Sequence, residues 1–173
     1  DLVYALKSKK SNLAMKLESC VKQASNGVYF FSETKIALDM IELSSEDIIR
    51  LISELQLTGS YDYIIIDMDF SIEKGVLNIC RKAHSIIWVG DGSEISNTKL
   101  CRALNALNII EDKADAPIPR RLNLIYNKFS NKTSKVVDGI GIANAGGAPR
   151  FEHATTAQVI DQLSKMDFFK NII

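Results

Sequence analysis

Along this chain, segments whose apolar residues recur with the period of a helix alternate with short apolar runs typical of strands. A period near 3.6 is typical of helices, whereas a run of β-branched or aromatic residues bounded by turn formers is typical of strands. Helices are expected over residues 2–9, 12–24, about 44–57, 74–83, about 94–108 and 156 to about 170. Strands are expected over residues 28–31, 62–67, 85–89 and 122–126, with loops at 111–119 and in the glycine-rich stretch 131–147.

Short polar motifs mark where some of these elements begin and end. Ser44 precedes an apolar stripe and is followed three residues later by Asp47, a pattern similar to a capping box with Asp in place of Glu. Gly59 is expected to close that helix. The Asn26-Gly27 pair is expected to turn the chain into the strand that follows.

The order of elements predicts an α/β fold. Strands separated by helical stretches of ten or more residues imply right-handed crossovers, which give a largely parallel sheet with helices on both faces. The 173 residues suit one domain, and the 46% apolar content is enough for a single core. We expect residues 62–67, 85–90 and 121–127 to form adjacent or nearly adjacent parallel strands.

The composition limits the expected partners and cellular compartment of the protein. Lys plus Arg and Asp plus Glu are balanced at 21 each, so no global field favours nucleic acid or an anionic membrane. Cys20, Cys80 and Cys101 lack C-x-x-C spacing, which argues against a disulfide framework or a structural zinc site and favours a reducing cytoplasm. The apolar stretches are far shorter than the roughly 18 residues that a membrane span requires.

One strand-like run ends abruptly in an acid. Residues 61–66 are largely apolar, Asp67 follows them, and Asp69 comes two residues later. Ligands of parallel sheets lie at the carboxyl ends of strands, and a carboxylate there is a way of holding Mg²⁺ beside a phosphate. No Gly-x-x-x-x-Gly-Lys-Ser/Thr phosphate loop occurs in the sequence. The other residues just past expected strands are Ser32, Gly90-Asp91 and Asn127-Lys128.

These motifs, in this order and spacing, resemble the MinD/ParA family of ATPases with the deviant phosphate loop, especially its pilus-assembly, CpaE-like branch. The stretch from Gly27 through Asp67 is similar to that family's strand, acidic helix and YDYIIID switch II strand. Three later segments also resemble the family: Ala83 to Val89, Leu124 to Lys128, which is similar to its "vlNk" strand, and Gly147 to Glu152. The resemblance implies a SIMIBI-like P-loop NTPase fold that binds ATP and Mg²⁺.

The resemblance also implies roles for individual residues. Asp67 matches the switch II acid, which in the family holds a water of the Mg²⁺ shell beside the γ-phosphate. Asn127 matches the Asn that reads the adenine edge, with Lys128 beside it, and Pro149 matches the Pro that packs near the base. Asp69 departs from the family's usual Thr-Pro-Pro, and is either a second outer-shell Mg²⁺ ligand or a sign of lost hydrolysis.

The missing phosphate loop shapes the expected domain. Residues 1–173 are expected to be the C-terminal part of one MinD/ParA-like ATPase domain, with the phosphate-loop strand supplied by upstream sequence or another polypeptide. This chain alone is then expected to be inactive. The resemblance further implies a homodimer of the full-length protein and protein partners, in the positioning or partitioning of chromosomes, plasmids, septa or pili.

Other interpretations stay open. A non-catalytic ATPase-like scaffold is favoured by Asp69 and by the absent phosphate loop. A receiver-like signalling domain has less support, because an acidic pair after the first strand and a Lys-Pro after the fifth are missing. Asp67 and Asn127-Lys128 are also explained as polar exits from strands. Residues 168–173 are a candidate for peripheral membrane contact, but their one Lys adds little charge and favours packing on the sheet.

Overall fold

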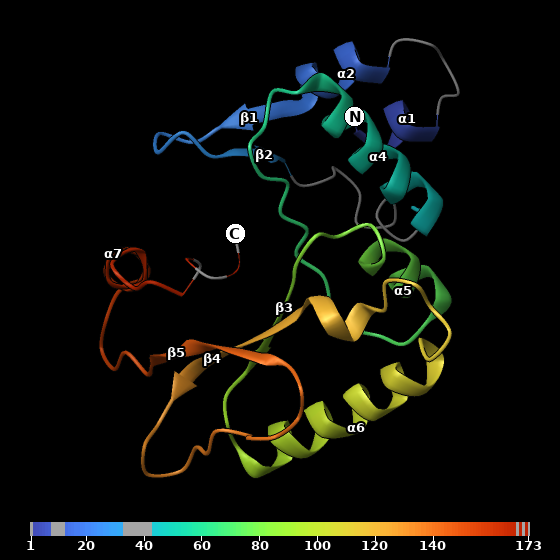
Figure 1. Ribbon diagram of the computed structural model, residues 1–173. Coiled ribbons are helices and arrows are strands. Elements are labelled where there is room, and N and C mark those ends of the chain that lie inside the picture. Colours follow the sequence, from blue (N-terminus) through green and yellow to red (C-terminus); the bar gives the residue numbers. More distant parts are fainter. Residues whose placement is uncertain (1, 8–12, 33–42, 169, 171, 173) are drawn as a thin grey trace. The chain divides into compact units, whose positions relative to one another are not determined.

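A computed structural model describes residues 2–7, 13–32, 43–168, 170 and 172. The chain divides into two compact units, Asp1–Lys82 and Ala83–Ile173, called here the first and second units. The first contains α1 (Leu2–Lys7), α2 (Leu13–Cys20), β1 (Val21–Gln23), β2 (Tyr29–Phe31), α4 (Ser45–Thr58) and α5 (Lys74–Cys80) (Figure 1). The second contains β3 (Ile86–Gly90), α6 (Glu94–Ile110), the 3-10 helix η1 (Ile118–Arg121), β4 (Leu122–Phe129), β5 (Ala143–Pro149) and α7 (Thr156–Ser164).

Three helices build the core of the first unit. α4 contacts both α1 and α2, and Ile52 of its predicted apolar stripe is buried. Leu51 and Leu55 of the same stripe pack against the buried side chains of α1 and α2. These buried side chains are Ala5, Leu6, Leu13 and Leu17. The helical period of α4 is therefore confirmed.

The predicted helix over residues 12–24 is too long. It ends at Cys20, and Val21–Gln23 forms β1, antiparallel to β2. A β-branched residue such as Val21 fits a strand better than another helical turn when a partner strand is present. The predicted turn is confirmed, because Gly27 has a φ of 89° and the Val28 N–H donates to Asn26 Oδ1 at 3.2 Å. Residues 8–12, where the ends of two predicted helices fall, lie outside the described residues.

The predicted strand over residues 62–67 is wrong. Residues 61–72 form no regular helix or strand, so they do not join residues 85–90 and 121–127 in a sheet. A β-branched run becomes a strand when a neighbour supplies hydrogen bonds, and no described strand pairs with this one. Tyr63 and Ile65 are consequently 65% and 90% exposed. Tyr61 contacts Tyr29 of β2 edge to face, with ring centroids 5.5 Å apart.

The first turn of α4 has the predicted capping box. The Asp47 N–H donates to Ser44 Oγ at 3.2 Å, and the Ser44 N–H donates to Asp47 Oδ2 at 3.0 Å. The Ser44 N–H and, to a smaller extent, the Ser44 hydroxyl donate hydrogen bonds to the Asp47 carboxylate, and both lower the pKa of this carboxyl. Gly59 closes the helix in a left-handed conformation with a φ of 62°. Both ends of α4 therefore lie at the residues that the sequence predicts, Ser44 and Gly59.

We expect Asp47→Asn to lower the free energy of unfolding by about 0.5–1 kcal/mol at neutral pH, since a neutral amide caps the helix less well. Because the pKa of Asp47 is lowered on folding, its stabilisation exists above the ordinary carboxyl range near about 4 and is lost as the pH falls through the folded value. Urea unfolding should therefore show the difference between wild type and variant shrinking as the pH falls below the ordinary carboxyl range. Glu54→Gln, in the same helix, is the control. An equal and pH-independent change in both variants would contradict the capping role.

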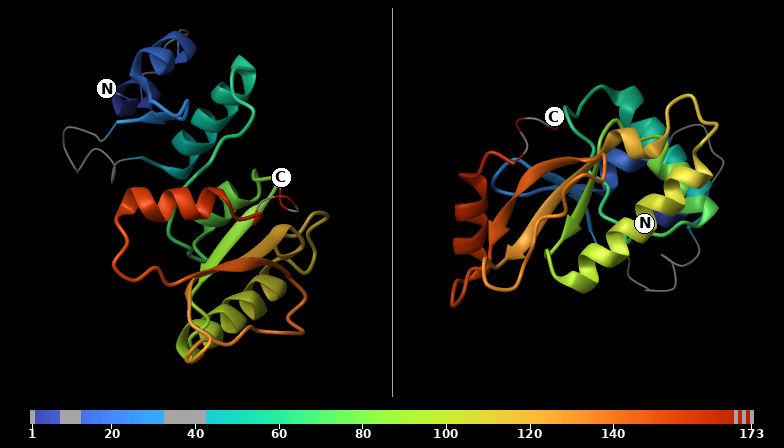
Figure 2. Two further views of the ribbon diagram at one scale, coloured as in Figure 1. Left: turned by 90° about the vertical axis from the view of Figure 1, so that its left-hand side faces the viewer. Right: turned by 60° about the horizontal axis from the view of Figure 1, so that its bottom comes forward.

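β3, β4 and β5 form the parallel sheet of the second unit, in that order. β3 pairs with β4 from Ile86 opposite Leu122 to Gly90 opposite Tyr126. Helices α6 and α7 lie on opposite sides of this sheet (Figure 1, Figure 2). The predicted α/β class with a largely parallel sheet is confirmed.

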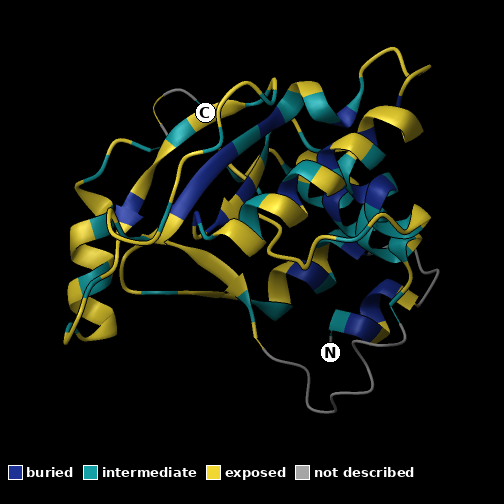
Figure 3. Cartoon of the chain, turned by 90° about the horizontal axis from the view of Figure 1, so that it is seen from below, coloured by how far each residue is buried: buried dark blue, intermediate teal, exposed yellow. Residues whose placement is uncertain are grey.

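The core of the second unit lies between α6 and the central strand β4. The predicted stripe of α6, Leu100, Leu104 and Leu107, is buried. β4 carries buried side chains at Leu124 and Tyr126, and its central part is dark blue in Figure 3. Three consecutive residues of β4, from Leu124 to Tyr126, are buried, as expected of a central parallel strand that is covered on both faces. Helix α7 has no buried residue and is mostly yellow in Figure 3.

Several predicted boundaries in the second unit are wrong. Residues 143–147, the end of the glycine-rich stretch expected to be irregular, belong to strand β5 (Ala143–Pro149). Hydrogen bonds from β4 outweigh their weak strand propensity. The predicted loop 111–119 runs into η1. Helix α7 ends at Ser164 instead of near Lys170. Beyond it, Phe168 packs on β5, where its Cδ1 would lie 3.4 Å from a Cβ added to Gly146.

Candidate functional site

The carboxyl ends of the three parallel strands meet at one edge of the second unit's sheet. β3 ends at Gly90, β4 at Phe129 and β5 at Pro149. The connection from β4 to β5, residues 130–142, contains no helix. Parallel strands are usually joined by a helix that covers one face of the sheet. This connection therefore leaves part of that face open beside β4 and β5.

The turn after β3 is fixed to this connection. Ser134 Oγ donates to the Asp91 carbonyl at 2.7 Å, and the Lys135 N–H donates to the Gly92 carbonyl at 2.8 Å. The Ser93 N–H donates to Asp91 Oδ1 at 2.9 Å, which lowers the pKa of the Asp91 carboxyl. Asp91, singled out by its place after a strand, is thus a structural residue of the turn.

Gly92 allows the close approach of the two segments. Its φ is 75°, and an added Cβ would lie 2.8 Å from Ser134 Cβ and 2.9 Å from Phe129 Cε2. We expect Gly92→Ala to lower the free energy of unfolding by about 2–4 kcal/mol, through backbone strain and overpacking together. Gly139→Ala is the matched control, because Gly139 has a φ of 71° but nothing within 4 Å of an added Cβ. It should cost only about 1 kcal/mol. Equal losses in urea unfolding would show that the packing at Gly92 is unimportant.

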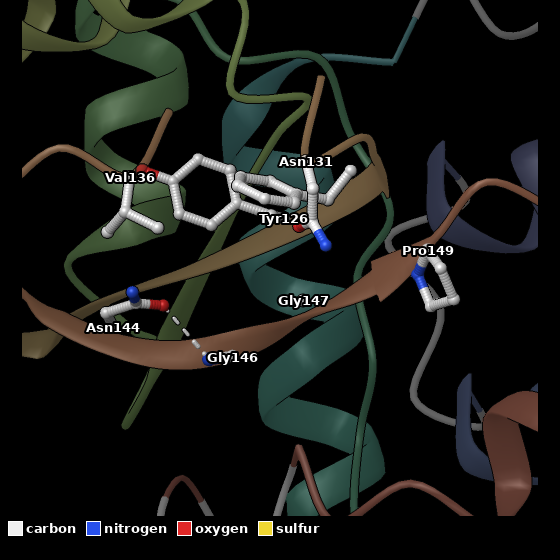
Figure 4. A pocket seen from close by; sticks show the side chains of 8 residues that line it. Tyr126, Asn131, Val136, Asn144, Gly146, Gly147 and Pro149 are labelled. Atoms are coloured by element: carbon white, nitrogen blue, oxygen red, sulfur yellow. Dashed lines mark hydrogen bonds between the residues drawn. The ribbon is translucent and has the colours of Figure 1, made fainter. Parts of the chain in front are cut away.

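A pocket of about 320 Å³ lies over β4, β5 and their connection (Figure 4). Pockets for small molecules begin at about this size, roughly 300 Å³. The rings of Tyr126 and Phe129 meet edge to face with centroids 5.3 Å apart, and the Tyr126 hydroxyl accepts from the Val137 N–H at 2.9 Å. The lining residues are Tyr126, Phe129, Asn131, Val136, Asn144, Gly146, Gly147 and Pro149.

Of the residues predicted to bind a base, Pro149 lines this pocket. Asn127 and Lys128 follow Tyr126 on β4, are exposed, and are not among the lining residues. They fall where the pairing between β4 and β5 is irregular, and Lys128 has a φ of 57°. This backbone is uncommon for a residue other than glycine and marks a local bulge.

Asp67 and Asp69, the predicted metal acids, belong to the first unit and are exposed in the irregular segment 61–72. Neither carboxylate makes a hydrogen bond or ion pair with another described residue. In the described part of the chain, no three His, Cys, Asp or Glu side chains gather as a metal site. Mg²⁺ at phosphate sites commonly uses one or two carboxylates, with phosphate oxygens and waters completing its shell. Two acids are therefore a compatible donor set.

Most of the pocket carries no sequence motif. Asn131, Val136 and Asn144 fall in the stretch that reads as irregular, where glycines hide strand β5. The one available signal is length, since the 13 residues from 130 to 142 are close to the minimum of about a dozen for a crossover between parallel strands. A short connection of this kind predicts an uncovered sheet face, although it does not predict which side chains line it.

Comparison with known proteins identifies the fold. No family model matches the chain, and no curated protein sequence matches it either. The crystal structure of a ParA family ATPase from Chlorobium tepidum TLS is similar, with a TM-score of 0.66 and 21% sequence identity. The similarity covers 99% of this chain and 71% of that chain. The chain thus shares the α/β fold of that ParA family ATPase. Among the described helices, none has the length and apolar character needed to cross a membrane.

Proposed function

We propose that this chain is the base-binding part of an ATP-binding domain of the ParA/MinD type. The observation that carries the proposal is the pocket over β4 and β5, which runs along β5 from Asn144 to Pro149 at its carboxyl end. Ligands of open α/β sheets bind at the carboxyl ends of the strands. Aromatic rings and side-chain amides, which line this pocket, suit a purine base.

Three residues at the ends of β4 and β5 have proposed roles in nucleotide binding. Pro149 packs against the base from the end of β5. Asn127 offers one amide donor and one acceptor to a purine edge, and Lys128 beside it offers a cation to the phosphates. Bulges often re-aim side chains next to active sites, and the left-handed backbone of Lys128 lies in such an irregularity.

We propose Asp67 as the acid that organises Mg²⁺ and Asp69 as a second outer-shell ligand. Both carboxylates are exposed and unpaired within the described residues, so neither must break an existing contact to bind a cation. A bound Mg²⁺ supplies charge neutralisation at the β- and γ-phosphates. Asp67 and Asp69 would act through waters of the Mg²⁺ shell, accepting hydrogen bonds from them and adding negative charge beside this hard cation.

We propose that a strand ending in a phosphate loop, from upstream sequence or another polypeptide, pairs with β3. In the described sheet β3 is an edge strand, and its Ile87 and Val89 are 38% and 65% exposed. An apolar edge of this kind is a template for a further strand. A parallel strand there would end at the same sheet edge as Gly90, where loop amides can bind phosphate.

The complete domain is proposed to position or partition cellular machinery, such as chromosomes, plasmids, septa or pili, as a homodimer with protein partners. The CpaE-like, pilus-assembly branch is the proposed affiliation, and the cytoplasm the proposed location. Cys20, Cys80 and Cys101 form no disulfide with one another, which suits a reducing compartment. The balanced charge gives no support to a nucleic-acid partner.

A non-catalytic ATPase-like scaffold is the second candidate function. The observation that favours it is the irregular, exposed segment around Asp67 and Asp69, because catalytic groups need rigid support. ATP binding and hydrolysis by the full-length protein separate the two candidates. Turnover supports the ATPase, tight binding without turnover supports the scaffold, and absence of both contradicts the nucleotide site.

A further inference from the structure

The chain around the carboxyl end of β4 is strongly basic. Residues 116–137 contain five Lys or Arg and no Asp or Glu. Lys132 and Lys135, in the connection after β4, are exposed, and so is Arg150, which comes directly after β5. The residue before Arg150 pairs with Phe129 of β4, so Arg150 lies at the level where this connection begins. The three cations Lys132, Lys135 and Arg150 are called here the basic edge.

Hydrogen bonds hold the turn that carries the two lysines. The Ser134 N–H donates to the Ser130 carbonyl at 2.7 Å, and the Ser130 N–H donates to Ser134 Oγ at 3.1 Å. These bonds close one turn with Lys132 at its centre. Asn97 Nδ2 of α6 donates to the Lys135 carbonyl at 2.9 Å, which adds to the contacts that fix this connection to the turn after β3. Both lysines are therefore presented from fixed backbone, which reduces the entropy lost on binding a partner.

The cations of the basic edge have no anionic partner among the described residues. None of the three makes an ion pair or a side-chain hydrogen bond there. Asp138 and Glu152, the acids nearest to them in sequence, are exposed and are not paired with them. Like charges without counter-charges repel one another, and a bound group of opposite sign relieves that repulsion. The basic edge is thus suited to a ligand that carries several negative charges.

We propose that the basic edge binds an acidic segment of a partner protein, whose carboxylates face Lys132, Lys135 and Arg150. The inference rests on the proposed function, which includes protein partners, and it gives the chemistry of one of them. Three cations match the few carboxylates of a short segment. Surfaces that bind nucleic acid usually belong to strongly basic domains and offer aromatic rings for stacking. The second unit has 11 Lys and Arg against 9 Asp and Glu, and Phe129 beside the turn packs on Tyr126.

Titration of the 173-residue chain, without nucleotide, with an octapeptide of alternating Glu and Gly tests the proposal by amide NMR. The same peptide with Gln in place of Glu is the control ligand. The Glu peptide is expected to shift the amide resonances of residues 130–136 and Arg150, with a Kd of about 1 mM at about 50 mM salt. Raising the salt to about 200 mM should weaken this binding about 3-fold or more, because exposed charge pairs are screened. The Gln peptide should bind at least about 10-fold more weakly than the Glu peptide.

A double variant with Lys132→Gln and Lys135→Gln removes two of the three cations and keeps the serine contacts of the turn. It is expected to weaken binding of the Glu peptide about 10-fold, or about 3-fold for each exposed charge pair. The matched control, Lys99→Gln with Arg102→Gln, removes the same charge from exposed residues of α6 and should change the affinity by less than about 2-fold. Lys128, proposed to face the phosphates, stays unchanged in both variants.

Three results would overturn the proposal. The first is equal affinity for the Glu and Gln peptides, and the second is a Lys132→Gln, Lys135→Gln variant that binds the Glu peptide as wild type does. The third is a DNA oligonucleotide of the same net charge that binds the same residues more tightly than the peptide, which would make the basic edge a nucleic-acid surface.

These outcomes are distinct from failure of the proposed ATPase, because no titration contains ATP. If the Glu peptide binds as expected but the full-length protein neither binds nor hydrolyses ATP, the docking surface stands and the nucleotide site fails. Turnover by the full-length protein, with no response of the basic edge to the Glu peptide, would have the opposite meaning.

Discussion

Replacing Asp67 by Asn, in a protein that also contains the phosphate-loop segment, is expected to cut ATP turnover by about 10-fold or more. The change preserves shape and removes only the charge that organises Mg²⁺. Folding should be nearly unchanged, because the Asp67 carboxylate is exposed and makes no hydrogen bond to another described residue. Phosphate release per folded molecule, measured together with the thermal midpoint, checks both parts of the expectation.

Asp62→Asn is the matched control for this prediction. It removes the same charge from an exposed residue at the start of the same irregular segment. Turnover should stay close to wild type in this variant. If Asp67→Asn lost thermal stability while turnover per folded molecule stayed normal, Asp67 would be a structural residue. Equal losses of turnover in both variants would indicate a general charge effect.

The parts of the fold that local chemistry determines are predictable from sequence. Helix α4 begins at Ser44 and closes at Gly59 because a capping box and a left-handed glycine act within a few residues. Helix α6 buries Leu100, Leu104 and Leu107 because its helical period is clear. Both predictions needed no information about the rest of the chain.

Strands are less predictable, because a strand depends on its neighbour. The segment 62–67 has strong strand propensity but no described partner, so it stays irregular. Ala143–Pro149 has weak propensity but lies beside β4, and it becomes β5. In both cases the hydrogen bonds available from another segment override the local sequence.

The candidate site shows the same division. Pro149, which the family resemblance places near a base, lines the pocket. Asn131 and Asn144 come together only because residues 130–142 connect β4 to β5 without a helix. A sequence pattern marks the ends of elements, whereas the lining of this pocket depends on which sheet face stays uncovered.

A second large effect is expected on ATP affinity. The 173-residue chain has a neutral pocket and two exposed acids, but its sequence has no phosphate loop. Its Kd for ATP is expected to be no tighter than about 1 mM, or about 4 kcal/mol of binding free energy. A longer protein with the phosphate loop upstream should bind about 1,000-fold more tightly, because helix N-terminal amides and a Lys engage the β- and γ-phosphates. Replacing that Lys in the longer protein should abolish most of this increase in ATP affinity.

Titration calorimetry with ATP and Mg²⁺, on this chain and on the longer protein, tests the proposed nucleotide site most directly. The expected result is about millimolar affinity for the chain and about micromolar affinity once the phosphate loop is present. Micromolar binding by the chain alone would show that the phosphates are held by residues other than the proposed ones. Unchanged millimolar binding in the longer protein would contradict the ATPase proposal and favour the scaffold.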